Sequence, residues 1–170
     1  AAQLCLRSMQ KLYPDSGNVL TVQSILGQAL SLALEHEKSV TVYTDAYALA
    51  KKNTGPASAN SLLLAVSLAE ATYQSGNLND ALQLLEQSQS HLESAQSDVR
   101  IPSAYLWMAL GRMYHYQDRL DDAEYYLEKA VQQLRELKDQ DPAGLARGLL
   151  NLGALVRGQG DIAEGRLCKQ

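Results

Sequence analysis

The stretch AYLWMALGRMYHYQDRLDDAEYYLEKA, residues 104–130, contains two amphipathic patterns separated by a short polar segment. Apolar residues recur at intervals of three and four, the spacing of one helix face. They are Leu106, Ala109, Leu110 and Met113 before the segment, and Ala123, Leu127, Ala130, Val131 and Leu134 from there on. Because residues 116–119 between them are polar, the stretch predicts a helix-turn-helix hairpin.

This hairpin pattern recurs along the chain. Residues 62–88, LLLAVSLAEATYQSGNLNDALQLLEQS, align with residues 104–130 without a gap, and Leu68-Ala69 then lies 42 residues before Leu110-Gly111. The same step leads forward to Leu152-Gly153 and back to Leu26-Gly27. A fixed period of this length indicates a repeat protein, in which each unit buries its apolar face against its neighbours.

The period divides the chain into one array of four units. We place them at residues 20–61, 62–103, 104–145 and 146–170, the first degenerate and the last truncated, with residues 1–19 as the end of a preceding repeat and a linker. Turns are predicted at residues 74–77, 116–119 and 158–161, and the first unit lacks Gly or Asn at its turn. Long second helices are predicted through residues 85–98 and 127–141. Pro14, Pro56, Pro102 and Pro142 all fall at unit junctions.

Composition excludes several classes of protein. The 170 residues are 46% hydrophobic and 20% charged and include no Phe, which favours a helical globular chain. A net charge of −4 without a Lys/Arg run argues against binding to nucleic acid. No apolar stretch is long enough to span a bilayer and no signal peptide pattern is present, so we expect a cytoplasmic, intracellular protein without membrane insertion. Cys5 and Cys168 are expected to be reduced thiols, and the chain is expected to be part of a longer protein.

The sequence offers little catalytic chemistry. His36, His91 and His115 lack the spacing of metal ligands, so no metal or other cofactor is expected. Gly158-Gln159-Gly160 lies in a predicted helix–helix turn rather than after a strand, which is a poor context for a phosphate loop. Asp121-Asp122 lies at a predicted helix start, where the helix dipole favours carboxylates without catalysis. We therefore expect a protein that is not an enzyme.

The repeated pattern resembles the tetratricopeptide repeat (TPR) family. The residues that carry the resemblance are Trp107, Leu110-Gly111, Tyr114, Ala123, Leu127 and Ala130. The family's usual unit has about 34 residues, whereas this one has 42. Units of this length, and Asn151-Leu152-Gly153-Ala154 in particular, look like those of kinesin light chains. The resemblance implies an all-α fold, a right-handed α-solenoid of stacked antiparallel helix pairs.

The resemblance also implies a protein-binding groove lined by the first helix of each unit. Carried over position by position, the groove residues are Glu70, Tyr73, Gln74, Tyr105, Met108, Arg112, His115, Tyr116, Arg147, Leu150, Asn151 and Arg157. Some members of the family clamp a C-terminal carboxylate with a Lys at the fifth position of an early unit. Here the fifth positions hold Ser24, Val66 and Met108, so that type of clamp is disfavoured.

The distribution of charge suggests the kind of partner. Arg112, Arg147 and Arg157 lie on first helices, whereas the second helix between them carries acidic residues from Asp121 to Glu136. A basic groove favours an acidic peptide. We expect a scaffold or adaptor that binds a protein or peptide ligand and that self-associates through its open repeat ends. The alternative is a regulatory or sensor segment of a larger signalling or transport-adaptor protein.

Overall fold

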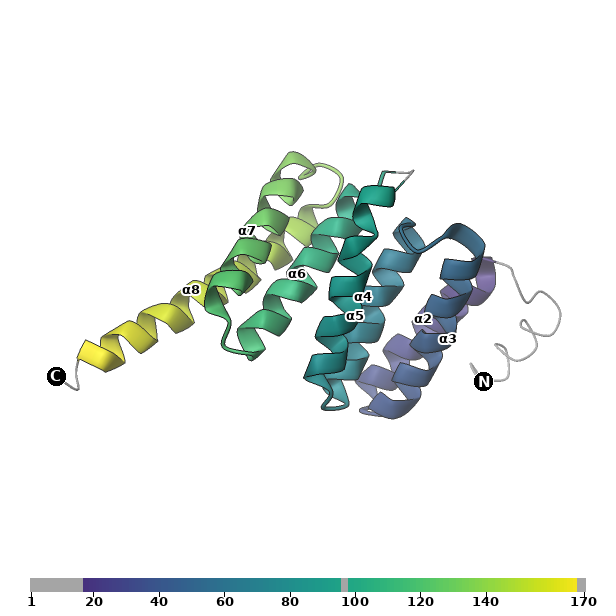
Figure 1. The fold of residues 1–170 in the computed structure, drawn as a ribbon, viewed down its shortest axis with the longest axis horizontal. Coiled ribbons are helices and arrows are strands. Elements are labelled where there is room, and N and C mark those ends of the chain that lie inside the picture. The colour runs from purple at the N-terminus through teal and green to yellow at the C-terminus, as the bar shows by residue number, and fades with distance from the viewer. Residues whose placement is uncertain (1–16, 96–97, 168–170) are drawn as a thin grey trace. The chain divides into compact units, whose positions relative to one another are not determined.

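The computed structural model describes residues 17–95 and 98–167, which form α-helices and one short 3-10 helix, with no strand among them (Figure 1). Of the predicted end of a preceding repeat and linker, residues 1–19, the first 16 residues lie outside the described residues, as do Cys5 and Cys168. The chain divides into two compact units, unit 1 (Ala1–Val99) and unit 2 (Arg100–Gln170).

Unit 1 consists of two helical hairpins. Its helices are α2 (Gly17–Leu32), α3 (His36–Thr54), α4 (Ala59–Gln74) and α5 (Leu78–Ser90), followed by the 3-10 helix η1 (Leu92–Ser94). Each helix packs against the next, and α2 also contacts α4. The core of the unit combines Tyr43, Ala46 and Tyr47 of α3 with Leu64 and Leu68 of α4.

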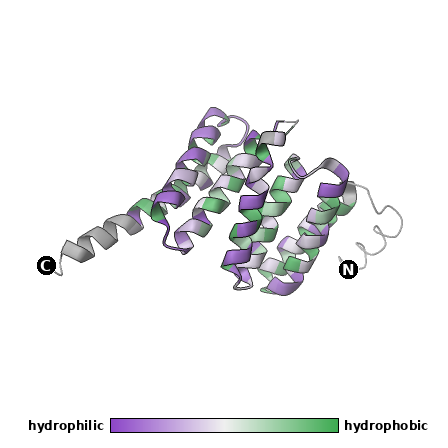
Figure 2. Cartoon of the chain, in the orientation of Figure 1, coloured by the Kyte–Doolittle hydropathy of each residue, from purple (hydrophilic) through white to green (hydrophobic). Residues whose placement is uncertain are grey.

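Unit 2 contains one hairpin and a further long helix. The elements are α6 (Arg100–Tyr116), α7 (Leu120–Glu136) and α8 (Pro142–Leu167), with α8 packed against both of the others. The buried residues of α7 are Ala123, Leu127, Ala130, Val131 and Leu134. This is the apolar face that the sequence predicts. Figure 2 shows hydrophobic and hydrophilic residues interleaved along each hairpin, as amphipathic helices require.

The turns inside the hairpins confirm the 42-residue period. Leu34, Gly76 and Asp118 have positive φ angles of 60°, 95° and 61°, and each lies 42 residues from the next. In each turn the amide that follows bonds to a carbonyl five residues back: Glu35 to Leu30, Asn77 to Thr72 and Arg119 to Tyr114, at 2.9, 3.1 and 3.0 Å. These bonds are those of a Schellman helix end. The first repeat therefore makes the same turn as the second and third, although it has no Gly or Asn there.

Leu34 is the most strained member of this set, because the left-handed conformation costs a residue with a Cβ about 1–2 kcal/mol and a leucine, unlike Asp118, has no short polar side chain to offset it with a local hydrogen bond. Its side chain is 77% exposed, so little packing is lost when it is removed. We expect Leu34→Gly to raise the free energy of unfolding by about 1 kcal/mol, measured by urea denaturation. Leu32→Gly is the control, since this equally exposed residue is helical and should lose about 1 kcal/mol. If Leu34→Gly also lowers the free energy of unfolding, Leu34 is not strained in the unchanged chain.

The small residues of the repeat pattern lie where two helices approach closely. A Cβ added to Gly111 would lie 2.6 Å from Cγ of Leu127 and 3.0 Å from the carbonyl oxygen of Ala123. Leu110, Leu127 and Trp107 of the same hairpin are 0%, 1% and 9% exposed. The Nζ of Lys129 covers the Trp107 ring, 4.2 Å from its centroid. The predicted role of these residues in packing is confirmed.

The turn predicted at residues 158–161 is wrong, because α8 continues through it to Leu167. A hairpin turn is stable when the second helix packs back onto the first. In the sequence, Gly165 stands where the second and third repeats have an alanine of the second helix. A continuous helix keeps its backbone hydrogen bonds without such a partner.

The second helices are also shorter than predicted. α5 ends at Ser90 and α7 ends at Glu136, where turns begin, rather than continuing through residues 98 and 141. The segment after α5 is rich in serine, and serine hydroxyls bond to nearby carbonyls: Ser90 to Gln87 and Ser94 to His91, both at 2.7 Å. Such local bonds compete with helix continuation.

Candidate functional site

Unit 2 contains a hollow where α6, α7 and α8 meet. Its volume is about 140 Å³, which is well below the roughly 300–1,000 Å³ of small-molecule sites. It therefore has room for about one side chain. The lining residues are Arg112, His115 and Tyr116 of α6, Leu127 of α7, and Asn151, Ala154 and Leu155 of α8.

The repeat register brings these residues together. Arg112 and Ala154 lie 42 residues apart, at the same position of successive first helices. His115 and Tyr116 lie one turn beyond Arg112, with their rings edge to face at a centroid distance of 6.0 Å. Leu127 and Leu155, each 1% exposed, form the apolar part of the hollow. Four residues predicted from the sequence, Arg112, His115, Tyr116 and Asn151, thus line one site.

The chemistry of this hollow suits an anionic group. Arg112, His115 and Asn151 are half-buried, and no acidic residue lines the hollow. The guanidinium of Arg112 and the amide of Asn151 can both donate hydrogen bonds to a carboxylate, and a guanidinium can do so with two parallel bonds. Because the surroundings are partly dry, such bonds are stronger here than on an open surface.

The other predicted residues of unit 2 lie outside the hollow. Arg147 is exposed and lies over the ring of Tyr105, with its guanidinium carbon 5.4 Å from the ring centroid. Burial, and then the carboxylate of Asp141, raise the pKa of Tyr105, and Arg147 lowers it in part. Leu150 is 73% exposed and Arg157 is also exposed. Met108, by contrast, is only 3% exposed, so it lies under the surface rather than on it.

The three predicted residues of unit 1 lie at the end of α4. Glu70 and Tyr73 are half-buried and Gln74, the last residue of the helix, is exposed. The pKa of Tyr43 of α3 is raised above its ordinary value. Burial is the main cause, the neighbouring Ser67 hydroxyl lowers the pKa in part, and the negative charge of Glu70 raises it further.

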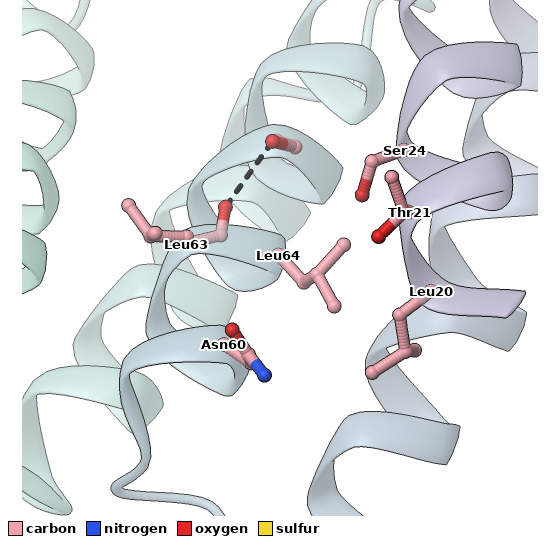
Figure 3. A pocket seen from close by; sticks show the side chains of 7 residues that line it. Leu20, Thr21, Ser24, Asn60, Leu63 and Leu64 are labelled. Carbon is pink, nitrogen blue, oxygen red and sulfur yellow. Dashed lines mark hydrogen bonds between the residues drawn. The ribbon is translucent and has the colours of Figure 1, made fainter. Parts of the chain in front are cut away.

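Unit 1 contains a second hollow between α2 and α4 (Figure 3). Its volume is about 190 Å³, and its lining residues are Leu20, Thr21 and Ser24 of α2 and Asn60, Leu63, Leu64 and Ser67 of α4. None of these residues is among the groove residues predicted from the sequence. Thr21 and Leu63 hold the same position of their 42-residue repeats as Tyr105 and Arg147. The repeat register that predicts Tyr105 and Arg147 as groove residues therefore applies equally to Thr21 and Leu63.

Part of the apolar face of α8 is exposed. Leu149 and Val156 are 43% and 51% exposed, whereas Trp107 and Tyr114, their counterparts one repeat earlier in α6, are 9% and 5% exposed. Self-association through this face stays a prediction. No described helix is long and apolar enough to cross a membrane. Across the described ranges, no group of three or more His, Cys, Asp or Glu side chains is placed to share a metal ion.

The sequence matches no protein-family model and no curated protein, but the structure is similar to solved helical-repeat structures. One is the crystal structure of BtubC (BKLC) from P. vanneervenii, with a TM-score of 0.73 and 20% identity over 98% of this chain and 67% of that one. Another is the putative kinesin light chain of Podosopora anserina with nearly identical TPR-like repeats, with a TM-score of 0.67 and 18% identity over 97% of this chain and 79% of that one.

This chain has the fold of the TPR-like repeat proteins. A point variant of the Podosopora anserina protein is similar to the same extent, with a TM-score of 0.69 and 18% identity over 97% of this chain and 78% of that one. The predicted fold class, an all-α solenoid of antiparallel helix pairs, is confirmed by these neighbours together with the helices of the described residues. In a TPR-like chain the first helices, here α2, α4, α6 and α8, supply the residues of both hollows, apart from Leu127 of α7.

Proposed function

We propose that this TPR-like chain is a non-catalytic scaffold that binds a peptide or partner helix on its first helices, with an acidic side chain in the hollow of unit 2. The observation that supports the proposal is the composition of that hollow. It holds a guanidinium, an imidazole and an amide over an apolar base, without a lining acid. We further propose that this chain is part of a cytoplasmic protein, and the reduced cysteines expected from the sequence support that location.

The dimensions of the hollow favour a peptide over a small molecule. A volume of about 140 Å³ leaves most of a drug-sized ligand uncovered. A peptide needs only one anchored side chain there, because the rest of its chain gains contacts along the helix surface. Arg and Tyr, both present at the rim, are the residue types that most often dominate such interfaces.

A charge reversal tests the proposal. We expect Arg112→Glu to weaken binding of a fluorescein-labelled Gly-Glu-Gly-Glu-Gly peptide by at least about tenfold, because the attraction of a half-buried charge pair is replaced by repulsion. Fluorescence anisotropy at low salt measures the affinity. Arg135→Glu makes the same charge change at an exposed position of α7 outside the hollow and is the control.

Two results would contradict the proposed site. If both variants weaken binding equally, the peptide responds to net charge alone. If neither variant changes the affinity, the acidic peptide binds elsewhere. The circular dichroism spectrum of each variant must match that of the unchanged chain, so that a loss of binding is not a loss of fold.

A further inference from the structure

The hollow of unit 1 differs from that of unit 2 in its chemistry. None of its lining residues is charged. Leu20 and Leu64 are 8% and 5% exposed and form its apolar base, and Leu63 is 40% exposed. Thr21, Ser24, Asn60 and Ser67 add uncharged polar groups around this base (Figure 3). A cleft with an apolar floor and a few polar groups at its edge is typical of a binding site.

Hydrogen bonds hold the polar edge of the hollow in place. Ser67 donates its hydroxyl to the carbonyl oxygen of Leu63 at 3.1 Å, the bond drawn in Figure 3. Below the edge, Tyr43 donates its hydroxyl to the carbonyl oxygen of Ser24 at 3.3 Å. This bond joins α3 to α2, next to the close contact between the Tyr43 ring and Gly27. The hollow is therefore built on fixed side chains rather than on a loop.

The repeat register explains why this hollow is open. Thr21 and Leu63 hold the second position of the first and second 42-residue repeats. In the third and fourth repeats, which belong to unit 2, the second positions hold Tyr105 and Arg147. These two residues lie against each other, with 5.4 Å between the guanidinium carbon and the ring centroid. A threonine is too short to make such a contact with its neighbour. The same place between first helices is thus closed by a cation–π pair in unit 2 and left open in unit 1.

We propose that the hollow of unit 1 is a second anchor site that takes an uncharged aliphatic side chain of leucine size from a bound peptide, with the amide of Asn60 bonding to the peptide backbone. A charged side chain would lose its hydration there without gaining an opposite charge from the lining residues. The inference rests on the proposed function and extends it: the partner peptide carries an aliphatic anchor as well as an acidic one.

The absence of charge among the lining residues decides between possible occupants. No lining side chain offers an opposite charge to an acidic or a basic side chain. Asn60 is exposed at the edge of the hollow, and Figure 3 shows it on the α4 side, facing α2 across the opening. An amide both donates and accepts, which suits the N–H and C=O groups that flank an anchored side chain.

The test is chemical-shift mapping of the ¹⁵N-labelled full chain with three probes: the N-acetyl, N-methylamide derivatives of leucine, lysine and glutamate. The leucine probe is expected to shift the backbone amides of residues 20–24 and 60–67 at concentrations where the two charged probes leave them unchanged. The glutamate probe is expected to shift residues 112–116 and 151–155. The two responses are independent, so a glutamate probe without effect in unit 2 would count against the proposed function alone.

Variants at exposed positions locate the leucine response. Leu63→Lys is expected to raise the midpoint concentration of the leucine response at least tenfold. Leu149→Lys is the matched control, because Leu149 is 43% exposed against 40% for Leu63 but lines neither hollow. Asn60→Ala, which removes only the amide, is expected to raise the midpoint about threefold. An unchanged response in both Leu63→Lys and Asn60→Ala, or a stronger response to lysine than to leucine at these amides, would overturn the proposal.

Discussion

Leu127→Ala is expected to lower the free energy of unfolding of unit 2 by about 3 kcal/mol, within the roughly 2–5 kcal/mol typical of a buried leucine. Leu127 is 1% exposed and lies against the backbone of Gly111 at the centre of the α6–α7 hairpin. The loss has two parts, the favourable free energy of burying the removed atoms, which the variant no longer gains, and the cost of the cavity left behind. The cavity is expected to persist because α6 and α7 cannot approach each other to fill it without displacing Ala123 and Ala130, which are both fully buried.

Urea denaturation followed by circular dichroism measures this loss. Leu150→Ala removes the same atoms from a residue of α8 that is 73% exposed, and it should change the free energy of unfolding by less than about 0.5 kcal/mol. Leu85 lies 42 residues before Leu127 and is 0% exposed, so Leu85→Ala should cost unit 1 a similar amount. A loss below about 1 kcal/mol at Leu127 would mean that the hairpin collapses around the substitution.

Much of the fold follows from the sequence because the repeat constrains each hairpin several times over. The turns predicted at residues 74–77 and 116–119 contain the positive φ angles of Gly76 and Asp118, and one period earlier Leu34 has a positive φ angle as well. Leu34 shows how strong this constraint is. Its side chain disfavours the left-handed conformation, yet the packing of α2 on α3 imposes it, which local sequence preferences would not predict.

The ends of the helices were harder to predict, since they depend on partners that periodicity does not reveal. Residues 158–161 have the composition of a turn, with two glycines and an aspartate, but they remain helical in α8. The serine-rich segment after Leu85 continues the apolar spacing of a helix, but local hydroxyl bonds end α5 at Ser90. In both cases the bonds within the segment itself outweigh the repeat.

The candidate site was predicted in part, and the residues that were missed have a common cause. Arg112, His115 and Tyr116 could be predicted because the resemblance places them at groove positions, and Asn151 because it is adjacent to one. The hollow of unit 1 is lined by Leu, Ser, Thr and Asn, residue types that are common on any helix surface. Whether such residues enclose a hollow depends on the side chains opposite them, as the contrast between Thr21–Leu63 and Tyr105–Arg147 shows.

The two Leu-Gly pairs of unit 2, Leu110-Gly111 and Leu152-Gly153, are equivalent in the sequence but lie in different surroundings. Gly111 is buried against α7, whereas a Cβ added to Gly153 would have nothing within 4 Å. A glycine inside a helix costs about 1 kcal/mol relative to alanine. At Gly153 no neighbouring helix packs close enough to require a glycine, so nothing offsets that cost. Gly153→Ala should therefore raise the free energy of unfolding by about 0.5–1 kcal/mol.

Gly111→Ala is expected to do the opposite and lower the free energy of unfolding by about 2 kcal/mol, because overpacking a tight core costs more than the gain in helix propensity. The new methyl group would lie 2.6 Å from Cγ of Leu127 and 3.0 Å from the backbone oxygen of Ala123, and a backbone oxygen moves only with its helix. The decisive measurement is the double variant Gly111→Ala, Leu127→Ala. Removing the leucine makes room for the methyl group, so the double variant should lose at least about 1 kcal/mol less than the sum of the single losses. Strictly additive losses would show that the two residues do not share this contact.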